Sequence, residues 1–163
     1  MRAILLAAIL ASALYGEVKA QSLAEQWAVC RGHDSERLIR ACTAILKAGR
    51  QTPGDLARAF FNRGRAWSDE AQYERAIQDF DRAIKLDPDY PDAFNHRALA
   101  YSGLGDYEHA IKDFDEAIRL DPNYAIAIFN RGLAFQTMGR PDEAAKDFAR
   151  AKETGPRLTS PKE

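Results

Sequence analysis

Three histidines and two cysteines are the side chains of this 163-residue sequence best suited to nucleophilic, redox or metal chemistry. His33, His96 and His109 lie in different segments, and none pairs with a serine or cysteine nucleophile in a recognisable motif. Cys30 and Cys42 lack the C-x-x-C spacing of redox catalysts, and with His33 nearby they match no common zinc pattern. The sequence therefore predicts no enzyme and no bound metal.

The glycines and the acidic pairs recur along the chain instead of marking one site. Each glycine falls at a packing or turn position, so none forms a phosphate-binding loop. Asp79 with Asp81 returns further along the chain as Asp113 with Asp115. We therefore expect no cofactor and no catalytic residues.

The first twenty residues have the pattern of a secretory signal peptide. Met1 and Arg2 supply positive charge, residues 4–15 are apolar apart from one serine, and Ala20 closes a segment suited to cleavage. The apolar run is about half of the ~20 residues needed to span a bilayer, so we favour cleavage over a retained anchor. This predicts a periplasmic or secreted protein with no membrane contact after cleavage.

Both cysteines follow the predicted cleavage site. An exported chain meets an oxidising compartment, where an even pair of cysteines tends to be joined. Cys30 and Cys42 are twelve residues apart, which is compatible with two short antiparallel helices. We expect a disulfide between them, with two small buried apolar side chains as the alternative.

Composition and charge narrow the class of protein. Hydrophobic residues make up 46% of the chain, and 23 Lys and Arg stand against 24 Asp and Glu. The net charge of -1 gives no basic face for nucleic acid, which is not expected as a partner. The length suits a single core or a single stack of repeats.

An internal repeat decides the fold. At a constant shift, which takes Ala57 to Pro91 and Pro91 to Ala125, the sequence aligns with itself in three units, 57–90, 91–124 and 125–156. Small and aromatic residues return in register at the same positions of each unit: Gly64, Ala98 and Gly132; Trp67, Tyr101 and Phe135; Ala76, Ala110 and Ala144; Phe80, Phe114 and Phe148; Pro88, Pro122 and Pro156.

Each unit is predicted to contain two helices. Large residues spaced three and four apart make an apolar stripe, and the small residues let a second helix approach closely. Glycine and proline break the helices at 102–105 and 138–141, and proline ends the units at 87–91 and 121–124. The sequence therefore predicts an all-α fold, an α-solenoid of antiparallel helix pairs.

These landmarks and their period resemble the tetratricopeptide repeat over Ala57 to Pro156, which implies a right-handed superhelix. Upstream, residues 36–47 resemble 74–85, so residues 21–50 are predicted to form a degenerate helical hairpin; 157–163 are a polar tail. The signal pattern and the cysteine pair are similar to those of small exported bacterial repeat proteins. The usual leucine of the first helix is replaced by arginine in all three units: Arg63, Arg97 and Arg131.

These arginines face a repeated aspartate. Each arginine stands one residue before the small packing position, and Asp79, Asp113 and Asp147 stand one before the repeated phenylalanine of the second helix. We expect a ladder of ion pairs, because partly buried arginine persists mainly where a carboxylate satisfies it. Contact with a ligand is the alternative.

The resemblance also implies a concave groove, lined by positions 2, 5, 6, 9, 12 and 13 of each unit. Asparagine side chains there could bind the backbone of an extended peptide, because they both donate and accept hydrogen bonds; solvated groove residues are the alternative. The candidate ligand-binding residues are Arg58, Asn62, Arg65, Asn95, His96, Asn130 and Gln136.

The function implied is that of a non-catalytic scaffold for protein interaction. Its partner would be a protein or a peptide held in the groove. A homo-oligomer that stacks through the uncapped C-terminal helix is the alternative.

Overall fold

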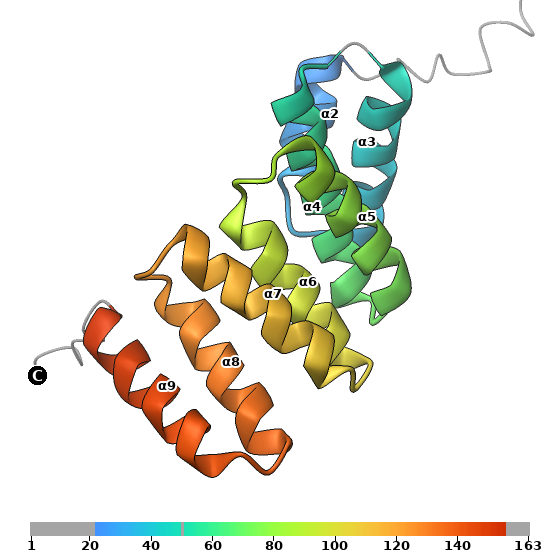
Figure 1. The fold of residues 1–163 in the computed structure, drawn as a ribbon. Helices are drawn as coiled ribbons and strands as arrows, with labels where there is room; N and C mark the ends of the chain where they lie inside the picture. Colours follow the sequence, from blue (N-terminus) through green and yellow to red (C-terminus); the bar gives the residue numbers. More distant parts are fainter. Residues whose placement is uncertain (1–21, 50, 156–163) are drawn as a thin grey trace, which may run out of the picture.

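A computed structural model describes residues 22–49 and 51–155, which form eight helices in antiparallel pairs (Figure 1). The predicted signal peptide, Pro156 and the polar tail lie outside the described residues. The helices are α2 (Leu23–Cys30), α3 (Ser35–Ala48), α4 (Pro53–Asp69), α5 (Tyr73–Leu86), α6 (Pro91–Gly103), α7 (Tyr107–Leu120), α8 (Ala125–Thr137) and α9 (Pro141–Thr154).

Capping residues and prolines set where several helices begin. Ser22 and Glu25 form a capping box on α2, and the side chain of Asp34 accepts from a backbone N–H at the start of α3. Pro91 and Pro141 occupy the first turns of α6 and α9, where a proline leaves no intrahelical hydrogen bond unmade. The predicted glycine breaks at 102–105 and 138–141 lie at the connections from α6 to α7 and from α8 to α9.

The first helix of the first unit is longer than the repeat predicts. α4 has 17 residues where α6 has 13, and it begins four residues before the unit boundary at Ala57. Its start is set by Thr52, whose Oγ1 accepts from the backbone N–H of Asp55, and by Pro53 in the first turn. This extra turn lies next to α2, which has only 8 residues.

Each helix pair is closed by a large side chain on the second helix that fills the space beside a small residue on the first. Phe80 and Phe114 are fully buried. A Cβ atom added to Gly64 would lie 2.8 Å from the ring of Phe80, and one added to Gly132 would lie 2.7 Å from the ring of Phe148. Larger residues would displace these rings, which explains the repeated small position.

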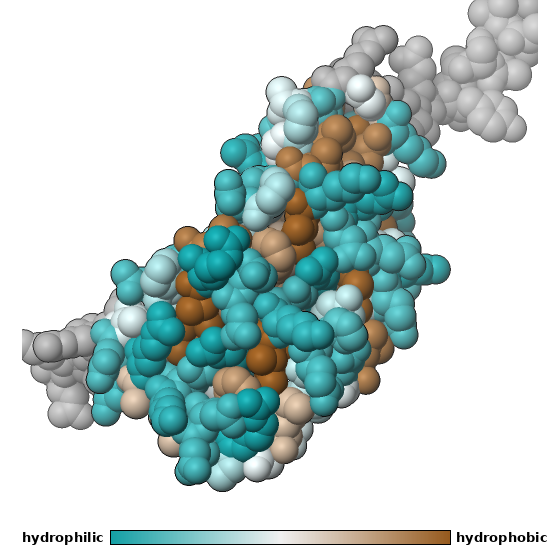
Figure 2. Space-filling model, in the orientation of Figure 1, coloured by the Kyte–Doolittle hydropathy of each residue, from teal (hydrophilic) through white to brown (hydrophobic). Residues whose placement is uncertain are grey.

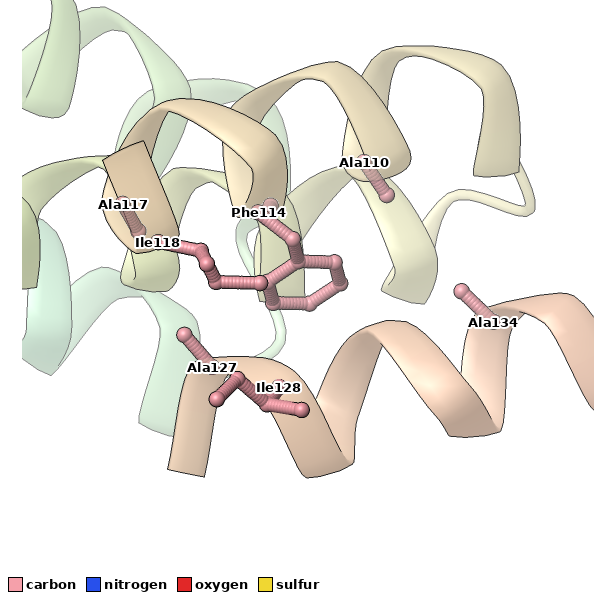
Figure 3. Close-up of a cluster of buried hydrophobic side chains, with 8 residues drawn as sticks. Ala110, Phe114, Ala117, Ile118, Ala127, Ile128 and Ala134 are labelled. Atoms are coloured by element: carbon pink, nitrogen blue, oxygen red, sulfur yellow. The ribbon is translucent and has the colours of Figure 1, made fainter. Parts of the chain in front are cut away.

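Successive pairs are joined by aliphatic contacts between a second helix and the next first helix. Figure 3 shows Phe114 and Ile118 of α7 directed at Ala127 and Ile128 of α8, and all four are buried. Because each pair buries its apolar surface on its neighbours, stability is distributed along the stack.

The predicted ion pairs are present in all three full units. Arg63, Arg97 and Arg131 each donate two hydrogen bonds of 2.7 Å to the aspartate sixteen residues later. These aspartates, Asp79, Asp113 and Asp147, are buried. The arginines therefore satisfy carboxylates inside the fold, and the ion-pair interpretation is confirmed.

The same arginines also reach back to the preceding unit, which the sequence analysis did not predict. Nη1 of Arg97 donates to Asp81 at 2.6 Å, and Nη1 of Arg131 donates to Asp115. Burial alone would lower the pKa of Arg97, but its hydrogen bonds and ion pairs with Asp113 and Asp81 outweigh burial and raise it. Each arginine therefore links two units.

A disulfide closes the N-terminal hairpin. Cys30 at the end of α2 is joined to Cys42 of α3, with Cα atoms 5.0 Å apart, and both residues are fully buried. The two cysteines occupy the positions that Gly64 and Phe80 occupy in the next pair, but they are separated by twelve residues instead of sixteen. The hairpin has therefore lost about one helical turn.

The stack is curved toward its first helices. α2 contacts α4, α4 contacts α6 and α6 contacts α8, whereas within the described residues no two second helices contact each other. First helices that lie closer together than second helices occupy the concave side. We call the exposed surface of α2, α4, α6 and α8 the groove face.

Candidate functional site

One row of the groove face changes from cationic to aliphatic along the stack. Its members follow one another at intervals of one repeat length: Arg31, which caps the C-terminus of α2, Arg65 of α4, Leu99 of α6 and Leu133 of α8. All four are exposed. We call it the Arg–Leu row. The two ends of the groove face therefore present different chemistry.

Exposed large apolar side chains gather at the C-terminal end. Ile126, Phe129 and Leu133 lie on one side of α8 and are 61%, 47% and 42% exposed; Leu99 of α6 is 39% exposed. The face drawn in Figure 2 is mostly hydrophilic, with smaller hydrophobic areas between the hydrophilic residues. We call these four residues the apolar patch. Such patches on water-exposed proteins mark interaction surfaces.

The N-terminal end contains an open hollow of about 540 Å³, which is within the usual size range of ligand sites. We call it the N-terminal hollow. Two of the predicted site residues, Arg58 and Asn62, line it. The lining consists of Ala24 and Trp27 from α2, its C-cap Arg31, Asp55, Arg58 and Asn62 from α4, and Tyr90.

The arginines of this end keep donors available for a ligand. Nε of Arg31 donates to the backbone oxygen of Trp27 at 3.2 Å, and the Arg65 guanidinium lies 5.9 Å from the ring centre of Phe61. Neither has a carboxylate oxygen within 4.0 Å among the described residues. Arg58 has an exposed carboxylate at 3.9 Å, a contact that contributes little.

Two further side chains at this end are neutral. Burial, with the positive charge of Arg65 nearby, lowers the pKa of His96 to about 4, and its ring centre lies 5.2 Å from that of Phe61. Burial and the carboxylate of Asp92 raise the pKa of Tyr90 to about 12. His96 therefore cannot serve as a cation at neutral pH, whereas Tyr90 remains a hydrogen-bond donor.

The expectation that Asn95 could bind a peptide backbone in the groove is wrong, and Asn130 is half-buried. Asn95 is only 2% exposed, and its Oδ1 accepts a hydrogen bond from Nδ2 of Asn130 at 3.3 Å. Asn95 stands at the unit position of Phe61, which is buried, and of Phe129, which is 47% exposed. Of the three predicted asparagines, Asn62 alone lines the hollow; among the other candidates, Gln136 is exposed near the end of α8.

Among the site residues that the sequence did not identify, Trp27 and Arg31 were missed because they lie in the degenerate hairpin. Trp27 and Arg31 stand one repeat length before Phe61 and Arg65, so the repeat shift itself could have identified them. The lost turn hides this register, because α3 aligns with α5 only at a shift that is longer by about one helical turn. The hairpin therefore extends the groove face by one helix.

The described part of the chain contains no group of three or more His, Cys, Asp or Glu side chains arranged to hold a metal ion. A second hollow of about 330 Å³ lies between α2 and α3, away from the groove face. None of the described helices is both long enough and apolar enough to cross a membrane.

Comparison with known proteins places this geometry in a family. Models of the tetratricopeptide repeat match residues 69–105, 91–124 and 125–154. The second TPR of Spaghetti (RPAP3), solved bound to the HSP90 peptide SRMEEVD, is 34% identical; the match covers 66% of this chain and 95% of that one, with a TM-score of 0.59. The chain belongs to the tetratricopeptide repeat family.

Other tetratricopeptide repeat structures share the architecture. A crystal structure of MamA is 28% identical, with 74% of this chain and 68% of that chain covered and a TM-score of 0.67. MamA from Desulfovibrio magneticus RS-1 has a TM-score of 0.72 with 85% and 76% coverage; at 20% identity it supports the fold alone. No curated protein matches the sequence.

Membership confirms the resemblance and the fold class expected from the sequence. Tetratricopeptide repeat proteins are generally non-catalytic interaction modules. On the groove face of this member, a hollow bearing arginines lies at one end and the apolar patch at the other.

Proposed function

We propose that the protein is a non-catalytic scaffold that holds a peptide or a protein surface in its groove. The observation that carries this proposal is the apolar patch, whose four side chains are 39% to 61% exposed on the concave side. Covering such side chains on binding is favourable by roughly 25 cal/mol per Å² of apolar surface. The related TPR domain solved with an HSP90 peptide supports peptide binding as the mode.

A paired set of variants tests the groove. Ile126→Asp with Leu133→Asp places two carboxylates in the apolar patch, and capture of the native partner should weaken at least about tenfold, because an unpaired charge opposes burial. Ala145→Asp on the exposed side of α9 is the matched control and should capture normally. Normal capture by the groove variant, with helicity unchanged in both proteins, would place the binding site elsewhere.

Self-association through α9 has less support than groove binding. The face of α7 that packs against the next unit carries Ile111 and Ile118, which belong to the core cluster shared with α8. The equivalent residues of α9 are Ala145 and Lys152. A polar outer face is how terminal repeats avoid stacking. Molecular mass independent of protein concentration is the expected result in solution.

We also propose that the protein is exported and works in the periplasm or outside the cell. The signal pattern of residues 1–20 motivates this proposal, and the disulfide supports it because such bonds persist in oxidising compartments. The N-terminus of protein isolated from its native host should be Gln21. Recovery of Met1 on cytoplasmic protein would contradict export.

A further inference from the structure

The Arg–Leu row limits what the groove can hold. Its first two members, Arg31 and Arg65, are exposed, and neither has a carboxylate within 4.0 Å in the described structure. Elsewhere, Arg63, Arg97 and Arg131 are each engaged by at least one aspartate. Two unpaired cations in one row favour an anionic partner at the N-terminal end.

Among the described residues, no carboxylate of the groove face forms an ion pair with Arg31 or Arg65, although the exposed Asp69 of α4 acts on the pKa of His96 in opposition to Arg65. Asp55, which stands beside Arg58, is the only carboxylate among the described residues that line the N-terminal hollow. Asp92 accepts a hydrogen bond from the hydroxyl of Tyr124 in the next unit. The hollow itself therefore has two arginines, one aspartate and two aromatic side chains in its wall.

The other half of the row offers aliphatic contact. Leu99 and Leu133 continue the line of Arg31 and Arg65, and Ile126 and Phe129 stand beside Leu133 on α8. In this half the Arg–Leu row is therefore uncharged. A ligand that ran the length of the groove would pass from a cationic to an apolar environment.

The spacing of the helices gives the length of such a ligand. Packed helices lie about 8–10 Å apart, and an extended chain advances about 3.3 Å per residue. One step along the row therefore corresponds to roughly three ligand residues. The centres of the arginine pair and of the leucine pair, two steps apart, are separated by about six residues of extended chain.

We propose, on the basis of the groove function above, that the partner is an extended peptide segment with an acidic part and an aliphatic part. It carries Asp or Glu at one end, bound by Arg31 and Arg65, and large aliphatic residues about six positions away, bound by the apolar patch. The cationic end selects partners by charge, and the apolar patch supplies most of the affinity.

Selection from a displayed library of random twelve-residue peptides tests this with the full-length protein. Enriched peptides should carry acidic residues separated by roughly six positions from Leu, Ile, Val or Phe. The variant Arg31→Gln with Arg65→Gln should lose the acidic enrichment and keep the apolar one. The variant Leu99→Ser with Leu133→Ser should lose the apolar enrichment and keep the acidic one.

A second measurement compares the affinity of one enriched peptide with that of a neutral copy, in which every Glu is replaced by Gln and every Asp by Asn. The wild-type protein should bind the acidic form about 2- to 10-fold more tightly, and roughly 0.5 M salt should remove this difference. The arginine variant should bind both forms equally.

The outcomes separate this inference from the groove function. Groove-dependent peptides without acidic residues, or with basic ones, would overturn the inference and leave the groove function standing. Enriched peptides insensitive to both groove variants would overturn both. A wild-type selection with no enrichment would also count against both.

Discussion

At the scale of single residues, the connections within the units differ at one position. Gly105 and Gly139 have φ of 79° and 72°, and the equivalent residue of the first unit, Ala71, has φ of 54°. A left-handed conformation costs a residue with a Cβ roughly 1–2 kcal/mol, and the greater freedom of glycine when unfolded offsets part of this. Ala71 is exposed, so its side chain makes no core contact that would be lost.

Ala71→Gly should therefore stabilise the protein by up to about 1 kcal/mol, measured by urea denaturation. The matched control is Gly105→Ala, which should destabilise the second unit by a similar amount for the same reason. If Ala71→Gly destabilised the protein, the conformational entropy that glycine loses on folding would outweigh the strain that alanine bears in the left-handed turn.

His96 makes the stability of the groove depend on pH. Its pKa is lowered to about 4, mainly by burial and further by Arg65, while Asp92 and Asp69 act in the opposite direction. The unfolded chain, with a pKa of about 6.5, binds this proton more readily. Stability should therefore be full above about pH 6.5 and fall as the pH drops toward 4.

The loss between pH 7 and pH 4.5 should be at most about 2–3 kcal/mol from this residue. The wild-type protein and His96→Gln can be compared by denaturation at several pH values, and the variant should lack this part of the decline. Parallel declines in the two proteins would assign the pH dependence to other groups.

At the scale of elements, the arginine ladder sets the register between a second helix and the next first helix. Arg97 of α6 is bonded both to Asp113 of α7, in its own unit, and to Asp81 of α5, in the preceding one. The Arg97 side chain is 18% exposed and that of Asp113 is 9% exposed. Removing one partner of such a pair leaves a poorly solvated charge.

Arg97→Leu should lower stability by about 2–4 kcal/mol, because Asp113 then remains buried without a partner. The double variant Arg97→Leu with Asp113→Leu should recover most of that loss, since apolar residues of similar size can replace a buried ion pair. Denaturation of both single variants and the double variant completes the cycle. Additive effects would show that the two side chains are not energetically coupled.

The repeat pattern predicted those elements well because it combines local and packing signals. Gly64 and Phe80 specify both the small position and the ring that fills it, so helix, turn and pairing follow together. Burial of Asn95 was not predictable in this way, because the equivalent residues differ: Phe61 is buried and Phe129 is 47% exposed. The environment of Asn95 also depends on the side chain of Asn130 from α8, the first helix of the next unit.

At the scale of the whole molecule, stability is a sum over neighbouring pairs, so a local change should remain local. Within the described residues, the N-terminal hairpin has a neighbour on one side only, and its first helix has 8 residues. The Cys30–Cys42 disulfide closes a short loop, which in the chain-entropy model stabilises by about 3 kcal/mol. The hairpin is therefore the part of the stack most dependent on one bond.

Replacing both cysteines by alanine should unfold α2 and α3 while α4 to α9 remain folded. Amide hydrogen exchange should rise chiefly over residues 22–48, and the N-terminal hollow should be lost, because Trp27 lies in α2 and Arg31 caps it. Peptides that depend on the cationic end should then bind more weakly, while contact with the apolar patch on α6 and α8 should persist.

The wild-type protein under reducing conditions is the matched comparison and should behave alike. Exchange that rose equally in all helices would contradict the independence of the units, and unchanged exchange would mean that packing alone holds the hairpin.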